Sequence, residues 1–451
     1  MKKLIAAILS AAMLITISGC SKGSDASDTS GSSETSDDTV SLSNPVKKTE
    51  DGDIDMEVAM QYETDFEALE ASLAEREVDN SLPVSLNARN NPKTMKIWNL
   101  LKENYGKKMI AAQQLMNLSK QYEDRVYYNA VEDIPAMKGF DFIFATGNTP
   151  DRGFVDAALD WGKTSGGLVT FCWHWNVPRD VDNPDLGRAF YMDHEGVKIE
   201  NWSALNATTP GTKEYEVAVH DIDLIASYLQ ELEAEGITVL WRPFHEASGS
   251  WFWWGLQDSD KLLIKDGTYP DTFQRLWYMM FDRLENYHKL SNIIWVWNGQ
   301  SKYCTVDPNT YDIAGIDFYA NKVDHSPCST KYNELASYSD EGKMLALSET
   351  GYIPDPQQCV DEGKVWLYYM TWNGGFIYDT GSDDNANGTP ILDFYETPEP
   401  NPKRLSNDLL KEYFTNDAML SWNDLADMDI PYGEHKLPQS LVNWKYFKDE
   451  A

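Results

Sequence analysis

The chain has 451 residues, of which 42% are hydrophobic and 12% aromatic, so it carries enough apolar material for a large core and is not of the disordered class. Its formal net charge of −34 at pH 7 repels phosphate backbones, which argues against nucleic-acid binding through a basic patch. The 16 Trp and 24 Tyr are many for one chain. These rings serve either a large core or the walls of a cleft, and composition leaves both uses open.

The first 19 residues have the pattern of a signal peptide. Lys2 and Lys3 precede an apolar run over residues 4–17, which is too short to span a membrane. The run ends in Ile17-Ser18-Gly19-Cys20, which resembles the bacterial lipobox, so we expect Cys20 to carry lipid after cleavage. A plain secretory signal with a chance cysteine is the alternative. The pattern thus predicts an exported protein, lipid-anchored through Cys20 at the bacterial cell surface.

Three further segments follow the signal peptide. Residues 20–55 are rich in Ser, Asp, Thr and Gly with few large apolar side chains, so they cannot offset their ordering entropy and are predicted to form a disordered tether. Residues 56–90 are predicted to form an N-terminal helical collar, with one helix over 56–77. Residues 91–451 are predicted to form one large domain.

Eight short apolar runs in this domain have the length and composition of strands. Amphipathic stretches such as 215–236 and 273–290 lie between them. The expected strands are 109–113, 141–145, 168–173, 237–241, 293–297, 313–318, 344–347 and 367–371. This alternation predicts an α/β fold, a (β/α)8 TIM barrel, in preference to an open doubly wound sheet, because no GxGxxG follows the first strand. After the barrel we expect a polar loop over 379–389 and a helix over 406–414.

The four cysteines after Cys20 allow up to two disulfides in an exported protein, by three connectivities. Cys172 lies in an apolar run and is predicted to be a buried thiol. We expect Cys304 with Cys328 as the more plausible bridge, and Cys359 is the fourth cysteine.

Metal motifs are incomplete. His245-Glu246 begins like HExxH, but residue 249 is Gly, so the second zinc ligand is missing. The segment 383–388 begins like a calcium loop, yet its twelfth position is Phe394 where Glu is needed. We therefore predict no metal and no cofactor.

Two glutamates stand where the polar residues of a barrel enzyme gather, at the ends of strands. Glu246 follows the fourth expected strand in Trp241-Arg242-Pro243-Phe244-His245-Glu246, and Glu349 follows the seventh in Leu347-Ser348-Glu349-Thr350-Gly351. A carboxylate pair of this kind is what cleavage of a glycosidic bond needs, one group to protonate the leaving oxygen and one to attack or to activate water. A single Glu is more often a surface charge. Aromatic residues near these two favour a catalytic site, because desolvation by such rings raises the pKa of an acid.

These segments carry a resemblance to glycoside hydrolase family 26. The Trp-Arg-Pro-x-His-Glu of 241–246, the Trp-Phe-Trp-Trp-Gly of 251–255 and the Leu-Ser-Glu-x-Gly of 347–351 resemble that family's motifs. The likeness extends from 111–114 through 138–141 and 171–175 to 371–373. Ala111-Ala112 and the loop 256–270 depart from the usual pattern, and the second departure puts the leaving-group subsites in doubt.

The resemblance implies roles for individual residues. Glu246 would be the general acid/base and Glu349 the nucleophile, about 5 to 5.5 Å apart if configuration is retained. Tyr319 would donate a hydrogen bond to Glu349, although a core tyrosine is the alternative. The other implied substrate-site residues are His174, Arg242, His245, Trp251, Asp317 and Trp372. Arg242 and Asp317 would form charge contacts around the pair, the two histidines would bind substrate hydroxyls or orient the carboxylates, and the two tryptophans would floor a subsite.

The function that the resemblance implies is a retaining endo-β-1,4-mannanase, acting on a β-mannan-type polysaccharide as its partner. The first alternative keeps the machinery and changes the polymer to mixed-linkage β-glucan or xylan. The second is a non-catalytic surface glycan-binding lipoprotein, which the presence of both carboxylates disfavours. We expect a monomer.

Overall fold

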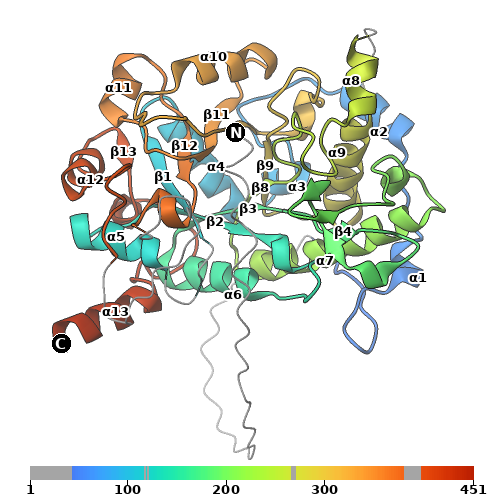
Figure 1. Cartoon of the computed structure of the whole chain (residues 1–451), viewed down its shortest axis with the longest axis horizontal. Helices are drawn as coiled ribbons and strands as arrows, with labels where there is room; N and C mark the ends of the chain where they lie inside the picture. The colour runs from blue at the N-terminus through green and yellow to red at the C-terminus, as the bar shows by residue number, and fades with distance from the viewer. Residues whose placement is uncertain (1–42, 116–117, 119–120, 266–270, 380–397, 451) are drawn as a thin grey trace, which may run out of the picture.

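Eight parallel strands close into a barrel, because β12 returns to pair with β1 (Figure 1). The strands, in order around the barrel, are β1 (Met109–Gln114), β2 (Met137–Asp141), β3 (Leu168–Cys172), β8 (Val239–Arg242), β9 (Ile293–Trp297), β10 (Ile313–Phe318), β11 (Met344–Thr350) and β12 (Tyr368–Thr371). This computed structural model describes residues 43–115, 118, 121–265, 271–379 and 398–450. The (β/α)8 barrel predicted from the alternation of strands and helices is confirmed.

The barrel strands are buried on both faces, since helices cover the outside and side chains fill the inside. β9 is the clearest case: its Ile-Ile-Trp-Val-Trp sequence shows no alternation, and all five residues are buried. A near-continuous apolar run of β-branched and aromatic residues is typical of such a strand.

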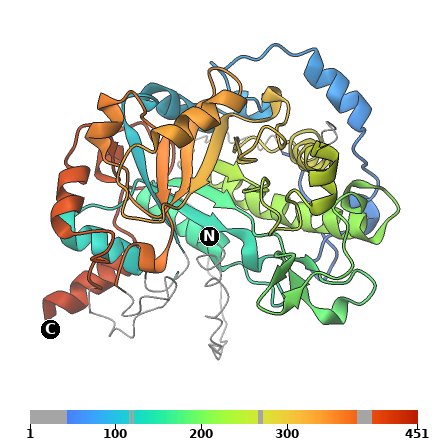
Figure 2. The ribbon, with the colours of Figure 1, turned by 45° about the horizontal axis from the view of Figure 1, so that its top comes forward.

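Helices lie around the outside of the barrel (Figure 2). Those between strands are α5 (Tyr122–Val131), α6 (Gly153–Asp160), α7 (Lys213–Ala234), α8 (Asp258–Lys265), α9 (Thr272–Asp282), α10 (Ser329–Tyr338) and α11 (Pro356–Asp361). α7 shows how sequence sets a boundary: the Thr212 side chain accepts a hydrogen bond from the Tyr215 N–H, and Glu214 and Glu216 occupy the first turn. Between β9 and β10, whose connecting residues are all described, only a 3₁₀ turn forms (Pro308–Thr310).

The second strand begins earlier than predicted. The run Phe142–Phe144, expected inside a strand over 141–145, forms a 3₁₀ turn because the Asp141 side chain accepts a hydrogen bond from the Ile143 N–H. The barrel strand instead includes Lys138, which is buried because it bonds to Asp124 Oδ2 at 2.5 Å. Asp141 is therefore the last residue of β2, at the C-terminal end of the barrel.

Residues 56–90, predicted as an N-terminal collar, contain the short helices α1 (Met56–Ala59), α2 (Phe66–Ala74) and α3 (Leu86–Arg89), and α4 (Pro92–Asn104) follows them. α1 and α2 lie on the same side of the body (Figures 1 and 2). The single helix expected over 56–77 is wrong: Met60 ends α1, and the Asp65 side chain caps a new helix by accepting from the Ala68 N–H. α1 packs on α7, and α2 packs on α9.

The predicted tether is also too long at its C-terminal end. The Asn44 N–H donates to the His288 carbonyl, the Val46 N–H donates to Gln230, and Asp53 pairs with His220 at 2.9 Å. Ile54 is buried. Specific side chains hold residues 44–55 on the barrel, which composition alone does not reveal. The signal peptide, Cys20 and the rest of the tether lie outside the described residues.

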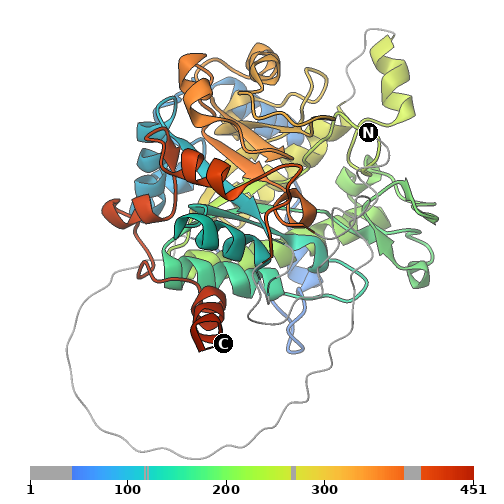
Figure 3. The same cartoon turned by 60° about the vertical axis from the view of Figure 1, so that its left-hand side comes forward.

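Further elements lie at the two ends of the barrel. Two hairpins follow β3, namely β4 (Val177–Pro178) with β5 (Arg188–Ala189) and β6 (Asp193–His194) with β7 (Val197–Lys198). After β12 come α12 (Asn407–Phe414), β13 (Met419–Leu420), which adds to β1, and α13 (Gln439–Glu450). α12 agrees with the helix expected over 406–414, whereas the loop expected over 379–389 and the calcium-like segment lie almost wholly outside the described residues. Figure 3 shows α8 and α13 projecting from opposite ends of the body. In the described part of the chain, no helix combines the length and apolarity that a bilayer crossing requires.

Candidate active site

Three carboxylates meet at the C-terminal end of the barrel. Glu246 follows β8, Asp317 lies in β10, and Glu349 lies in β11. One carboxylate oxygen of each lies within 4.8 Å of those of the other two. The two glutamates that the sequence placed at separate strand ends are thus brought to one point.

A β-bulge sets this meeting. β10 and β11 pair in simple register as far as Ile316 and Leu347, and the register then shifts so that Asp317 lies opposite Glu349. Ser348 is the extra residue of the bulge. Without it Glu349 would lie opposite Phe318, so the bulge re-aims the carboxylate as bulges beside active sites do.

Glu349 is buried and held by two donors. Arg242 Nη2 donates to its Oε1 at 2.6 Å, and Tyr319 Oη donates to its Oε2 at 2.6 Å. Burial raises the pKa of Glu349, and the Asp317 charge raises it further, while Arg242 and Tyr319 oppose the rise by stabilising the charged form. Both oxygens of Glu349 therefore have donors suited to an ionised carboxylate.

Arg242 links two of the acids. Its Nη1 donates to Asp317 Oδ2 at 3.0 Å while its Nη2 binds Glu349, and the guanidinium is fully buried. A buried arginine of this kind persists only with paired charge around it. Because the guanidinium already supplies positive charge to Asp317 and Glu349, the three-acid group needs no metal ion to account for it.

Glu246 has a different environment. It is partly exposed, its backbone has a φ of +54°, and its Oε2 accepts a hydrogen bond from Trp251 Nε1 at 2.8 Å. Enclosure by neighbouring groups raises the pKa of Glu246 well above its usual value, and the charges of Asp317 and Glu349 raise it further. Glu246 thus has the surroundings of a group that keeps its proton, and Glu349 those of one that loses it.

The loop after Glu246 makes room for Trp251. A Cβ atom on Gly249 would lie 2.3 Å from the Trp251 ring, so only glycine lets the indole lie close enough to reach the carboxylate. Trp251 is 37% exposed, which leaves part of the ring open to solvent. Its neighbours Phe252, Trp253 and Trp254 are buried, and their rings pack on one another.

His174 and His245 form a buried pair. His174 Nδ1 bonds to Asp141 Oδ2 at 2.5 Å, and the Nε2 atoms of the two rings lie 3.2 Å apart. Burial lowers the pKa of His245 well below its usual value, and His174 and Arg242 lower it further, so the ring is neutral. The hydrogen bonds of these rings among the described residues go to each other and to Asp141, so their roles toward substrate stay predictions.

Trp372 lies beside this pair. It follows β12, and its backbone N–H donates to the Thr350 carbonyl at 3.0 Å. Its ring centroid lies 6.2 Å from that of His174. Tyr319 and Phe376 continue the aromatic lining, with centroids 5.5 Å apart. Arg242, Tyr319, Trp251 and Asp317 thus lie against the two glutamates, and His174, His245 and Trp372 form a neighbouring group. What each residue does to substrate stays a prediction.

Sequence reasoning missed three residues of this site. Asn298 follows β9, accepts the Glu246 N–H at 3.2 Å and donates to Asp317 Oδ1 at 2.8 Å. Ser348 donates to the same oxygen at 2.7 Å, and Asp141 orients His174. Asn298 closes an apolar run as Glu246 does, so the strand-end rule could have found it. Asp141 was missed because it was placed at the start of a strand that it ends.

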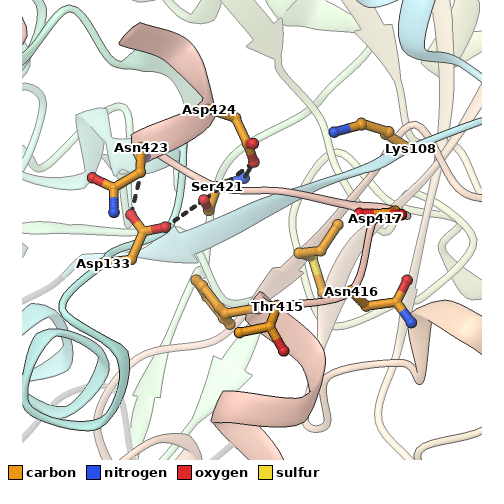
Figure 4. A pocket seen from close by; sticks show the side chains of 10 residues that line it. Lys108, Asp133, Thr415, Asn416, Asp417, Ser421, Asn423 and Asp424 are labelled. Carbon is orange, nitrogen blue, oxygen red and sulfur yellow. Dashed lines mark hydrogen bonds between the residues drawn. The ribbon is translucent and has the colours of Figure 1, made fainter. Parts of the chain in front are cut away.

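Other candidate ligand groups are already satisfied or lie elsewhere. Asp141, Cys172 and His174 bring ligand-type atoms within 4.8 Å, but Asp141 and His174 bond to each other. A polar hollow lined by Lys108, Asp133, Asp417 and Asp424 lies where β13 joins β1 (Figure 4). Since it lies at the N-terminal end of the barrel, it is remote from the three acids.

The disulfide expected between Cys304 and Cys328 is wrong, because both are free, as are Cys172 and Cys359. Cys304 is buried in the loop after β9, whereas Cys328 directly precedes α10. Cys172 is a buried thiol, as predicted.

Comparison with known proteins agrees with this arrangement. Residues 84–390 match the model of Glycosyl hydrolase family 26. Mannan endo-1,4-β-mannosidase B of Piromyces sp is 33% identical over 380 residues, covering 81% of this chain and 58% of the relative. Mannan endo-1,4-β-mannosidase A of Piromyces sp is 32% identical over 374 residues, covering 80% and 54%. The chain thus spans little more than half the length of these curated relatives.

Solved structures give the same result. A GH26-CBM35 β-(1,4)-mannanase of Podospora anserina has a TM-score of 0.60 at 27% identity, covering 78% of this chain and 71% of that one. A β-mannanase from a symbiotic protist of the termite Reticulitermes speratus has a TM-score of 0.59 at 25% identity, covering 78% and 98%. The barrel, with acids at the C-terminal end of its strands, places this chain in the class of (β/α)8-barrel enzymes. The chain belongs to glycosyl hydrolase family 26.

Proposed function

We propose that the protein is a retaining endo-β-1,4-mannanase, with Glu246 as the general acid/base and Glu349 as the nucleophile. The observation that carries the proposal is the approach of the Glu246 and Glu349 carboxylate oxygens to within 4.8 Å of each other. Retaining enzymes hold their carboxyl groups about 5–5.5 Å apart, whereas inverting enzymes leave about 6.5–9.5 Å for a water molecule. The observed approach supports the retaining mechanism.

The first step joins the sugar to the enzyme. A Glu349 oxygen attacks the anomeric carbon while the glycosidic bond breaks, and Glu246 gives its proton to the leaving oxygen. The hydrogen bonds from Arg242 and Tyr319 support a nucleophile that is ionised and aimed. The raised pKa of Glu246 supports an acid that is protonated at the start.

The second step releases the sugar. Glu246, now a carboxylate, takes a proton from water, the water oxygen attacks the anomeric carbon, and the bond to Glu349 breaks. The charge that returns to Glu349 is again met by Arg242. Attack from opposite faces in the two steps returns the anomeric configuration to that of the substrate.

The substrate proposed is a neutral β-mannan-type polysaccharide such as mannan, glucomannan or galactomannan. Two curated relatives and two solved neighbours carry mannanase names, which supports this choice of polymer. The partly open ring of Trp251, whose Nε1 donates to Glu246, supplies an apolar face on which a pyranose can stack.

A polysaccharide panel tests the proposal. Purified wild-type protein and Glu349→Ala are assayed for reducing sugar on galactomannan, glucomannan, mixed-linkage β-glucan and xylan, with products sized by chromatography. The wild type is expected to release short oligosaccharides from the two mannans, and Glu349→Ala is expected to release none. Preferred cleavage of β-glucan or xylan would overturn the choice of polymer, and full activity of Glu349→Ala would overturn the mechanism.

We also propose that the enzyme is exported and anchored through lipid on Cys20. The support is the sequence alone: Lys2 and Lys3, the apolar run over 4–17, and the lipobox-like Ile17-Ser18-Gly19-Cys20. Residues 21–43 would then hold the barrel away from the membrane, since residues 44–55 contact the barrel.

A further inference from the structure

Asn298 occupies a central place among the acids. It follows β9 directly, and its side chain is fully buried. Its Oδ1 accepts the Glu246 N–H at 3.2 Å, and its Nδ2 donates to Asp317 Oδ1 at 2.8 Å and to Ser348 Oγ at 2.5 Å. One amide group thus joins the residues that follow β8 to β10 and to the bulge in β11.

The backbone of Glu246 needs such a partner. Glu246 has a φ of +54°, and Phe244, two residues before it, has a φ of +52°. Residues other than glycine adopt this region at a cost and persist there when the surroundings fix them. The hydrogen bond to Asn298 is such a constraint, because it holds the N–H of Glu246 itself.

The space for Asn298 is provided by a neighbouring glycine. A Cβ atom on Gly315 of β10 would lie 2.6 Å from Ser348 Oγ and 3.2 Å from Asn298 Nδ2. A side chain at position 315 would therefore push apart the hydroxyl and amide that meet Asp317. The position of the Asn298 side chain therefore depends on position 315 having no side chain.

We propose that Asn298 is a positioning residue that aims the Glu246 carboxyl at the leaving oxygen of the substrate. This inference rests on the proposed role of Glu246 as the acid. Asn298 does not touch the glycosidic bond; it acts through the backbone of Glu246, and its bonds to Asp317 and Ser348 fix the amide itself.

The leaving group distinguishes this role from a general structural one. A sugar leaving group must be protonated as it departs, whereas a dinitrophenolate departs without an acid. A displaced Glu246 therefore slows mannan cleavage and leaves the first step on an aryl substrate nearly unaffected. Damage to the fold or to Glu349 would slow both substrates alike.

The experiment measures kcat/KM of Asn298→Ala on mannohexaose and on dinitrophenyl β-mannobioside. Displacement of a reacting group by about 1 Å lowers rates about 100-fold, so we expect a loss of that order on mannohexaose. On the aryl substrate we expect a value within about threefold of the wild type, because the acid contribution is not needed there. Asn298→Ser, which is smaller but polar, is expected to show the same split and serves if the alanine variant does not fold.

Asn292 gives a matched control just before the same strand. It is buried and donates to the Leu229 and Ile237 carbonyls, at the end of β9 away from the acids. Asn292→Ala should lower Tm and leave both kcat/KM values in their wild-type ratio.

Glu246→Ala, assayed in parallel, separates the two proposals. A large loss on mannohexaose with activity kept on the aryl substrate supports Glu246 as the acid. Suppose that Glu246→Ala loses much more kcat/KM on mannohexaose than on the aryl substrate, while the Asn298 variants lose equally on both. The inference about Asn298 is then overturned, and the proposed function stands. If Glu246→Ala loses kcat/KM equally on the two substrates, the proposed function itself fails.

Discussion

Removing the Tyr319 hydroxyl should move the pH dependence of hydrolysis. Tyr319 Oη donates to Glu349 Oε2 at 2.6 Å, and this hydrogen bond lowers the pKa of Glu349 by stabilising its charged form. Tyr319→Phe keeps the ring beside Phe376 and removes only the donor. Without it the protonated form of Glu349 is favoured, so ionisation of the nucleophile requires a higher pH.

The size of the shift follows from the strength of the bond. A hydrogen bond to a charged group contributes about 1.5–3 kcal/mol, and one pKa unit corresponds to about 1.36 kcal/mol. That gives about 1 to 2 units, and we expect the lower figure because Tyr319 is partly exposed and water can replace part of its contact. The acidic limb of the kcat/KM profile should therefore move up by about one unit.

The assay is a profile of kcat/KM against pH on a soluble manno-oligosaccharide. Tyr278→Phe is the matched control, because its hydroxyl accepts the Asp307 N–H at 3.1 Å, far from the acids, and its loss should lower Tm without moving the profile. An acidic limb that stays in place in Tyr319→Phe, with the fold intact, would refute the assignment of Glu349 as the group that must ionise.

Three other outcomes are expected. Gly249→Ala should push the Trp251 ring away from Glu246 and lower kcat/KM about tenfold with little change in Tm, since one hydrogen bond is lost; unchanged kinetics would count against the Trp251 contact. His220 has a pKa raised to about 9 by two carboxylates, so its stabilisation is full below pH 6.5 and is lost as pH rises through about 9. The Tm gap between wild type and His220→Gln, followed by calorimetry, should close over that range, and a constant gap would contradict the ion pairs. Cys20→Ser, expressed in a bacterial host, should move the enzyme from the membrane fraction to the soluble fraction; no change would exclude the anchor.

Some parts of the fold could be predicted because one physical signal dominates them. β9 and β10 have the bounds 293–297 and 313–318 that their apolar runs predict, since strands buried on both faces carry little else. The predicted bounds of β2 were wrong because Lys138 interrupts the apolar pattern of that strand. That lysine is tolerated only through a distant partner, Asp124, which sequence does not identify.

The site divides in the same way. The glutamates could be found because each lies at or just after the end of an apolar run and belongs to a recognisable motif. The bulge at Ser348 could not, because a shift of register depends on how two strands meet and leaves no mark in either one. The pairing of Asp141 with His174 likewise depends on contact between strands 33 residues apart in the chain.

The most direct test of the central claim is to trap the sugar on the enzyme. A 2-fluoro β-mannosyl fluoride forms the covalent intermediate and slows its release, so the modified residue can be identified by peptide mass spectrometry. If Glu349 is the nucleophile, we expect one label per protein, on Glu349, and none in Glu349→Ala. A label on Glu246 or Asp317, or products that first appear with inverted configuration, would contradict it.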